Sequence, residues 1–209
     1  MRTSRQAYRI REEDDFIELG KCKLVSDETY FGDTNYVTAS MLKALATDTK
    51  LYEHRYVKGH QMKETPAMEL GSAVHAMLAG MEDMVVAYDG VRRGKDYLAW
   101  VQDQPEGALI VPKKVHEIAF NCMLAMDRHP LIHNLLSDEG LCGDTRHEEC
   151  YAWTDDAYDT PCKFKPDWFN ESLRMVIDYK TIARFSERAI KKQIVDLKYH
   201  LQAAHYMMG

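Results

Sequence analysis

The chain has 209 residues, 45% of them hydrophobic, and a formal net charge of −6. It can bury one sizeable core, and with no run of about 18 apolar residues it is predicted not to span a membrane. Its acidic balance excludes a generally basic nucleic-acid coat, so any contact with a polyanion must be local, through a basic groove or a metal.

Residues 1–35 carry mixed charge and turn signals, and we expect an irregular lead-in with one short strand. From Ser40, which can cap a helix, the apolar spacing predicts a helix followed by a second helical piece around residues 51–56. Residues 58–63 (KGHQMK) read either as a solvated loop or as a loop that touches phosphates.

Thr65 and Pro66 then mark a helix start, because proline is tolerated in the first turn. The helix (PAMELGSAVHAML) is apolar on most of its surface. Gly71 in its middle costs roughly 1 kcal/mol against alanine, which suggests a close approach by another element. His75 is a polar residue in this apolar run, and alone it can be a satisfied core group or a ligand.

The middle of the chain alternates between strands and helices. We predict strands at 84–88 and 108–111, a short helix at 95–102, a long helix from Pro112, and another short helix after it. Its methionines and other apolar residues are most simply core packing. No residue between 80 and 140 suggests catalysis.

Three consecutive antiparallel strands are expected at about 146–153, 162–169 and 174–180. In the first, alternation puts Glu148 and Glu149 on opposite faces, and the sequence does not decide which of the two faces a site. In the second, Lys163, Lys165 and Asp167 share one face. In the third, Asp178 and Lys180 share a face.

The last two strands form a hairpin that brings Asp167, Asp178 and Lys180 toward one end. Carboxylates on a rigid strand beside a cation suit a hard divalent metal and a phosphate. An Asp–Lys pair at a strand end is, however, also a common surface ion pair worth about 0–1 kcal/mol. Beyond the hairpin, Ser186 can cap a helix, and Gln202 and Tyr206 lie four apart on one face of the following helical segment.

The cysteines are odd in number and scattered, without a CxxC pair: Cys22, Cys122, Cys142, Cys150 and Cys162. We therefore expect reduced thiols in a cytoplasmic protein. An iron–sulfur cluster would need a tight cysteine group after the third strand, and none follows Cys162.

Four separated motifs, GSAVHAML, KPDW, IDYKT and YHLQAAHY, together resemble the RecB-like branch of the PD-(D/E)xK nucleases. They are most similar to the exodeoxyribonuclease VIII (RecE) type of phages and prophages. The resemblance covers roughly residues 35–208. It implies an α/β (α+β) fold with a restriction-endonuclease-like core, a mixed central sheet flanked by helices.

The resemblance also implies roles for individual residues. Asp167 and Asp178 would ligate Mg²⁺ or Mn²⁺ with the Tyr179 carbonyl, and His75 would be a further ligand or an orienting group. Lys180 would position or deprotonate the attacking water, or neutralise charge on the phosphorus. The remaining expected groups are Gln202 and Tyr206 as supports, Glu148 as an additional acid, and Lys163 and Lys165 as phosphate contacts.

By the same resemblance, the protein is a metal-dependent exonuclease that degrades linear double-stranded DNA 5′→3′ in a bacterial host cell. It would leave 3′ single strands for an annealing protein in phage-type recombination, and it would form a ring-shaped homo-oligomer. Two alternatives stay open: another RecB-like activity (single-strand exonuclease or endonuclease), and a DNA-binding or assembly module that keeps the fold without turnover. An unrelated α/β domain would require four coincidences.

Members of that family continue past the Gln-x-x-x-Tyr helix with at least one more strand. We therefore expect an irregular segment at 1–35 and a nuclease-like domain at 36–209 that lacks its last C-terminal strand.

Overall fold

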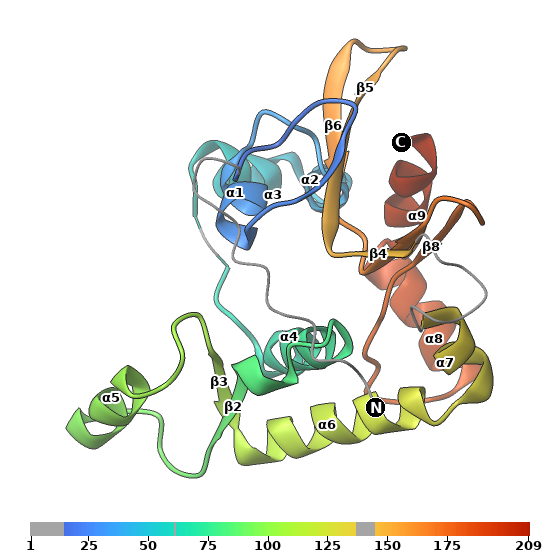
Figure 1. Cartoon of the computed structure of the whole chain (residues 1–209). Helices are drawn as coiled ribbons and strands as arrows, with labels where there is room; N and C mark the ends of the chain where they lie inside the picture. Colours follow the sequence, from blue (N-terminus) through green and yellow to red (C-terminus); the bar gives the residue numbers. More distant parts are fainter. Residues whose placement is uncertain (1–14, 61, 137–144) are drawn as a thin grey trace. The chain divides into compact units, whose positions relative to one another are not determined.

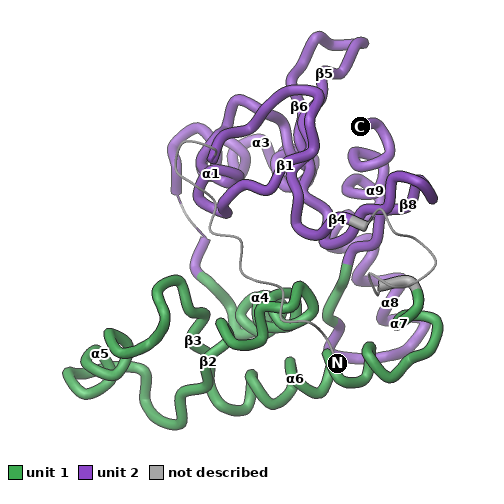
Figure 2. Tube along the Cα trace, viewed as in Figure 1, with its two compact units in different colours: residues 1–8, 64–145, 179–181 green, residues 9–63, 146–178, 182–209 purple. Residues whose placement is uncertain are grey.

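A computed structural model describes residues 15–60, 62–136 and 145–209 of the chain (Figure 1). These residues form two compact units, shown in different colours in Figure 2. Unit 1 contains residues 64–136, 145 and 179–181, and unit 2 contains residues 15–60, 62–63, 146–178 and 182–209. Within the described ranges no helix combines the length and apolar character needed to cross a lipid bilayer.

Unit 1 consists mainly of helices around a pair of parallel strands. Its elements are α4 (Pro66–Leu78), η3 (Glu82–Met84), β2 (Val85–Tyr88), α5 (Lys95–Gln102), β3 (Leu109–Pro112), α6 (Lys113–Asp127) and α7 (Pro130–Leu136). Strands β2 and β3 pair from Val85↔Leu109 to Tyr88↔Pro112, and α4 and α6 pack on each other and on these strands. The sequence-based prediction for this region is confirmed.

The core of unit 1 lies between α4, α6 and the two strands. Its buried members are all apolar: Ala73, Val74, Met77, Leu78, Val85, Val111, Ala119 and Met123. The methionines of this region therefore fill the core, as expected. Burial of such side chains contributes about 1.5–3 kcal/mol each, so this cluster stabilises α4 firmly in its unit.

Helix α4 begins where the sequence predicts. The Thr65 side chain accepts a hydrogen bond from the Met68 amide at 3.3 Å, and Pro66 occupies the first turn. The expectation for Gly71 is wrong, because a Cβ built there would meet only Thr181 Oγ1, at an ordinary 3.8 Å. Among the residues that the structure describes, no close approach explains this glycine.

Unit 2 contains the N-terminal helices, the strands of the predicted hairpin region and the C-terminal helices. Its elements are β1 (Cys22–Leu24), α1 (Asp27–Gly32), α2 (Ala39–Leu45), α3 (Thr49–Tyr52), the π-helix η2 (Glu53–Val57), β5 (Glu149–Asp155), β6 (Thr160–Phe164), β7 (Trp168–Asn170), β8 (Met175–Ile177), α8 (Glu187–Asp196) and α9 (Tyr199–Met208), with β4 (Thr145–His147) at its border. The strands form two sheets with the orders β1-β5-β6 and β4-β7-β8, and the pairs β1–β5, β5–β6 and β7–β8 are antiparallel.

Two strands that we expected to be continuous are each divided in two. The first breaks at Glu148, whose φ of 52° is left-handed, so that β4 and β5 belong to different sheets. The second breaks at Lys165, Pro166 and Asp167, between β6 and β7. Proline has no N–H to donate to a ladder, and a left-handed residue turns the strand direction, so both strands change sheets at these points.

The N-terminal part of unit 2 is more regular than the sequence suggests. A short helix, α1, lies inside the predicted lead-in, and Ser26 Oγ caps it by accepting from the Thr29 amide at 3.0 Å. Helix α2 is capped by Thr38 and not by Ser40. The cap that we predicted at Ser186 is confirmed for α8, and Lys198 with a φ of 51° separates α8 from α9.

The described cysteines, Cys22, Cys122, Cys150 and Cys162, are free thiols. Cys142 lies outside the described residues. Burial raises the pKa of the Cys22 thiol to about 12 and that of Cys150 to about 11, which keeps both protonated near neutral pH.

Candidate metal and nuclease site

Three carboxylates of unit 2 lie at the ends of neighbouring strands. Glu148 directly precedes β5, and it offers a carboxylate oxygen within 4.8 Å of one of Asp167. The β7–β8 ladder pairs Trp168 with Ile177, so Asp167, which precedes Trp168, and Asp178, which follows Ile177, lie at the same end of this ladder. The three acids therefore form a carboxylate row at the point where both long strands change sheets.

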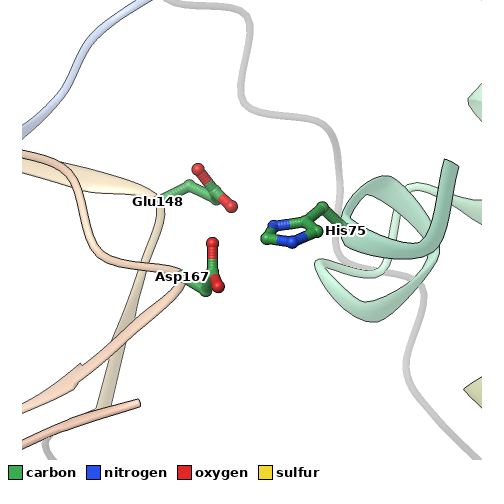
Figure 3. Close-up of side chains that lie close together, drawn as sticks. All are labelled: His75, Glu148 and Asp167. Atoms are coloured by element: carbon green, nitrogen blue, oxygen red, sulfur yellow. The ribbon is translucent and has the colours of Figure 1, made fainter. Parts of the chain in front are cut away.

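Glu148 and Asp167 are the best-defined pair of this row. Their carboxylates offer oxygen atoms within 4.8 Å of each other, and Figure 3 shows them turned toward one another. Figure 3 also draws His75, which belongs to unit 1. The Asp167 side chain is buried with 9% of its surface exposed, while Glu148 is half-buried.

Of Glu148 and Glu149, between which the sequence does not choose, Glu148 has a left-handed backbone and offers a carboxylate oxygen within 4.8 Å of Asp167. Glu149 instead accepts from Arg146, at 3.4 Å. Two acids facing each other in a partly buried place repel one another, and such an arrangement is typical of sites that bind a cation.

Asp178 is held by the C-terminal helix. Gln202 Nε2 on α9 donates to Asp178 Oδ1 at 2.8 Å, and the same nitrogen lies 2.9 Å from the Tyr206 hydroxyl. The Tyr206 hydroxyl also lies 3.5 Å from the Lys165 carbonyl. Burial, with the nearby Asp178, raises the pKa of Tyr206 well above its usual range, so this hydroxyl stays neutral.

A fourth member of this network, Lys43, was missed by sequence analysis. Its ammonium group on α2 donates to Gln202 Oε1 at 2.6 Å. A lysine on a short amphipathic helix carries no sequence signal that distinguishes it from a solvated surface residue. Only the packing of α2 on α9 brings it to the amide.

Three expected site residues lie in unit 1, and two of them bond to the third. His75 Nε2 lies 3.1 Å from the Tyr179 carbonyl, and Lys180 Nζ donates to the same carbonyl at 3.2 Å. A carbonyl oxygen only accepts, so the His75 ring carries its proton on Nε2 in this contact. Both lone pairs of the Tyr179 carbonyl are thus engaged by protein donors.

The two lysines expected to contact phosphates differ sharply. Lys163 is fully buried, and its Nζ donates to the carbonyls of Tyr30 and Asp33 at 2.5 and 2.6 Å. The predicted phosphate contact of Lys163 is therefore wrong, because a side chain without exposed surface cannot reach DNA. Burial lowers the pKa of this ammonium group. Lys163 has a structural role, because its two hydrogen bonds connect β6 to the C-terminal end of α1.

Lys165 lies at the edge of the carboxylate row. Its Nζ is 2.5 Å from the Asp27 carboxylate and 3.6 Å from Glu148. Its side chain keeps 11% of its surface exposed. Lys163 and Lys165 were expected on one face of one strand, but β6 ends at Phe164 between them. Lys163 is therefore oriented by the β5–β6 ladder toward the core, whereas Lys165 lies beyond the strand and approaches the acids.

The donor set of the row suits a hard divalent cation. Mg²⁺ takes oxygen ligands at about 2.0–2.1 Å, so two oxygens bound to one ion lie at most about 4.2 Å apart. The separation between the Glu148 and Asp167 oxygens, within 4.8 Å, needs only a small rotation of either side chain to meet this requirement. Carboxylate oxygens favour Mg²⁺ and Mn²⁺ over metals that prefer sulfur or nitrogen.

The mixed α/β fold and the row of acids on adjacent strands define a domain of the PD-(D/E)xK type. Residues 38–209 match the family described as "PDDEXK-like domain of unknown function (DUF3799)", and the chain belongs to this family. No curated protein matches the chain. Membership of this family suggests a nuclease, and nucleases of this type generally use a divalent metal.

Proposed function

We propose that the protein is a Mg²⁺- or Mn²⁺-dependent deoxyribonuclease that degrades linear double-stranded DNA from its 5′ ends. The carboxylate row of Glu148, Asp167 and Asp178 carries this proposal. In keeping with the RecE-type resemblance, the product would be a 3′ single strand used in phage-type recombination with an annealing protein. The resemblance further supports a ring-shaped homo-oligomer in the cytoplasm of a bacterial host.

The acids and His75 would have different roles at the metal ion. Glu148 and Asp167 would hold the ion, with Asp178 as the third acid of the row. His75 would be a further ligand or an orienting group, which is supported by its contact with Tyr179, the chain neighbour of Asp178.

When bound, the ion would lower the pKa of a coordinated water and stabilise negative charge at the phosphorus. Lys180 would position this water or take up its proton, by turning from the Tyr179 carbonyl toward the substrate. In the hydrolysis, the water oxygen forms a bond to phosphorus, the P–O bond to the 3′ oxygen breaks, and that oxygen receives a proton. Lys165, next to Glu148, would contact a neighbouring phosphate oxygen as a point charge.

An acidic protein can bind DNA in this way because the contact is local. The ion and two lysines, Lys165 and Lys180, would supply positive charge that offsets the negative charge of the carboxylate row. Binding should then depend on the metal more than on the overall charge, which is −6.

The decisive experiment is digestion of a linear duplex with 5′-phosphate ends in Mg²⁺, Mn²⁺ or EDTA. It compares wild type, Lys180→Ala and the matched control Lys191→Ala, an exposed lysine of α8 that pairs with Glu187. We expect mononucleotide release from wild type and the control in metal alone, and none from Lys180→Ala. Label at one end of one strand reports the polarity.

Other outcomes point to the other functions. Release from single strands alone indicates a single-strand exonuclease, and cutting of a closed circle indicates an endonuclease. DNA binding without cleavage in any divalent metal refutes the enzyme and favours a binding module.

A further inference from the structure

The amide of Gln202 is held from both sides by charged groups of opposite sign. Lys43 Nζ on α2 donates to its oxygen at 2.6 Å, and its nitrogen donates to Asp178 Oδ1 at 2.8 Å. All three residues belong to unit 2. The chain Lys43–Gln202–Asp178 is therefore a continuous polar connection between α2 and the end of β8.

The two charged neighbours determine which end of the Gln202 amide faces each of them. The oxygen and nitrogen ends of a glutamine amide have nearly the same shape, so packing alone does not decide which end faces a neighbour. An ammonium group only donates, and an ionised carboxylate only accepts. With Lys43 on one side, the reversed amide would place N–H groups against the ammonium and an oxygen against the carboxylate.

The position of Lys43 is itself determined by packing. The residues flanking it on the inner face of α2, Met41 and Ala44, are buried, and α2 packs on α9. The Lys43 ammonium also lies 5.3 Å from the centre of the Tyr199 ring, a favourable cation–π contact. Lys43 thus reaches Gln202 from a helix surface that is anchored in the core.

We propose that Lys43 is a positioning residue of the metal site, acting through Gln202 on the carboxylate of Asp178. This inference rests on the proposed function. Lys43 orients the amide, the amide directs its N–H group to Oδ1, and this hydrogen bond fixes the orientation of the Asp178 carboxylate. The amide dipole also passes part of the lysine charge toward Asp178.

The alternative for a lysine near a nuclease site is a direct phosphate contact. That role would raise KM and the salt dependence of DNA binding, whereas a positioning role leaves both unchanged and lowers kcat. Groups that orient metal ligands typically change metal affinity or activity by about 10–100-fold.

The test uses the full chain with Lys43→Met, Lys43→Arg, Gln202→Leu, the double variant Lys43→Met/Gln202→Leu, and Lys191→Met as control. Mn²⁺ affinity is measured by isothermal titration calorimetry without DNA, and kcat and KM on linear duplex. We expect Lys43→Met to weaken Mn²⁺ binding and to lower kcat, each by about 10-fold, at unchanged KM. Lys43→Arg should recover most of both losses, and Lys191→Met should behave as wild type.

The double variant separates this mechanism from a general loss of structure. If Lys43 acts through Gln202, the double variant is no worse than Gln202→Leu alone; additive losses overturn the inference. If wild type binds Mn²⁺ and cleaves DNA, and Lys43→Met does both equally well, the role of Lys43 is refuted and the proposed function stands. A wild type that neither binds Mn²⁺ nor cleaves overturns both.

Discussion

Replacing Asp167 by asparagine should stabilise the protein without metal and remove its response to metal. Asp167 is buried and faces Glu148 across at most 4.8 Å between carboxylate oxygens. Two unit charges at that distance repel by about 3.5 kcal/mol at an effective dielectric constant of about 20. Lys165, 3.6 Å from Glu148, offsets part of this repulsion. We therefore expect a net gain of about 1–2 kcal/mol in the free energy of unfolding of Asp167→Asn in EDTA.

The same substitution should remove the increase in the free energy of unfolding that a divalent metal produces in wild type. A ligand that binds only the folded state stabilises it by about 2.7 kcal/mol at a concentration 100 times its Kd. Wild type should show this increase in Mn²⁺ or Mg²⁺. Asp167→Asn should not, because an amide oxygen replaces a carboxylate in the row.

Urea unfolding of both proteins, in EDTA and in excess Mn²⁺, measures all four free energies. Glu149→Gln is the matched control, since Glu149 pairs with Arg146 and not with the row. If Asp167→Asn is less stable than wild type in EDTA and still responds to Mn²⁺, the two carboxylates are not a metal site and the reasoning fails.

Three further predictions concern the scaffold. Gly71→Ala should raise the free energy of unfolding by about 1 kcal/mol, because its methyl group would meet only Thr181 Oγ1 at 3.8 Å; a lower urea midpoint would contradict this. Lys163→Met should lower stability by about 1–3 kcal/mol by removing the donor to the buried Tyr30 carbonyl and to the partly buried Asp33 carbonyl, and should leave the salt dependence of DNA binding unchanged. Burial lowers the pKa of His205, so the unfolded state takes up a proton first as pH falls below about 6.5, and stability is lost in that range. His205→Gln should reduce the slope of unfolding free energy against pH between 7 and 5 by at most about 1.4 kcal/mol per pH unit, and an identical slope would refute this.

The predictions that hold from sequence rest on local chemistry. Thr65 and Ser186 cap their helices because hydroxyl side chains bond free amides within three residues, whatever surrounds them. The hairpin places Asp167 and Asp178 at the same end of the β7–β8 ladder, next to the pair Trp168 and Ile177, because the turn fixes the register of the two strands that it joins. The family motifs add the PD-(D/E)xK class, which the match over residues 38–209 confirms.

The predictions that fail assume that each predicted strand is continuous. Period-two alternation put Lys163 and Lys165 on one exposed face, but alternation assumes an unbroken strand. Lys163 lies inside β6 and is buried, whereas Lys165 lies beyond the end of that strand, and the left-handed residue Glu148 offers a carboxylate oxygen within 4.8 Å of Asp167. A single residue of irregular backbone reverses the facing of everything beyond it.

Sequence alone thus determined the class of this protein and the acids of its hairpin, because caps, turns and register are set by residues near one another in the chain. Only the tertiary structure brought Glu148 close to Asp167, and Lys43 into contact with Gln202, from which it is 159 residues away. Such contacts depend on which helix faces pack together. That packing is set by the burial of apolar surface over the whole domain, so no short sequence motif predicts it.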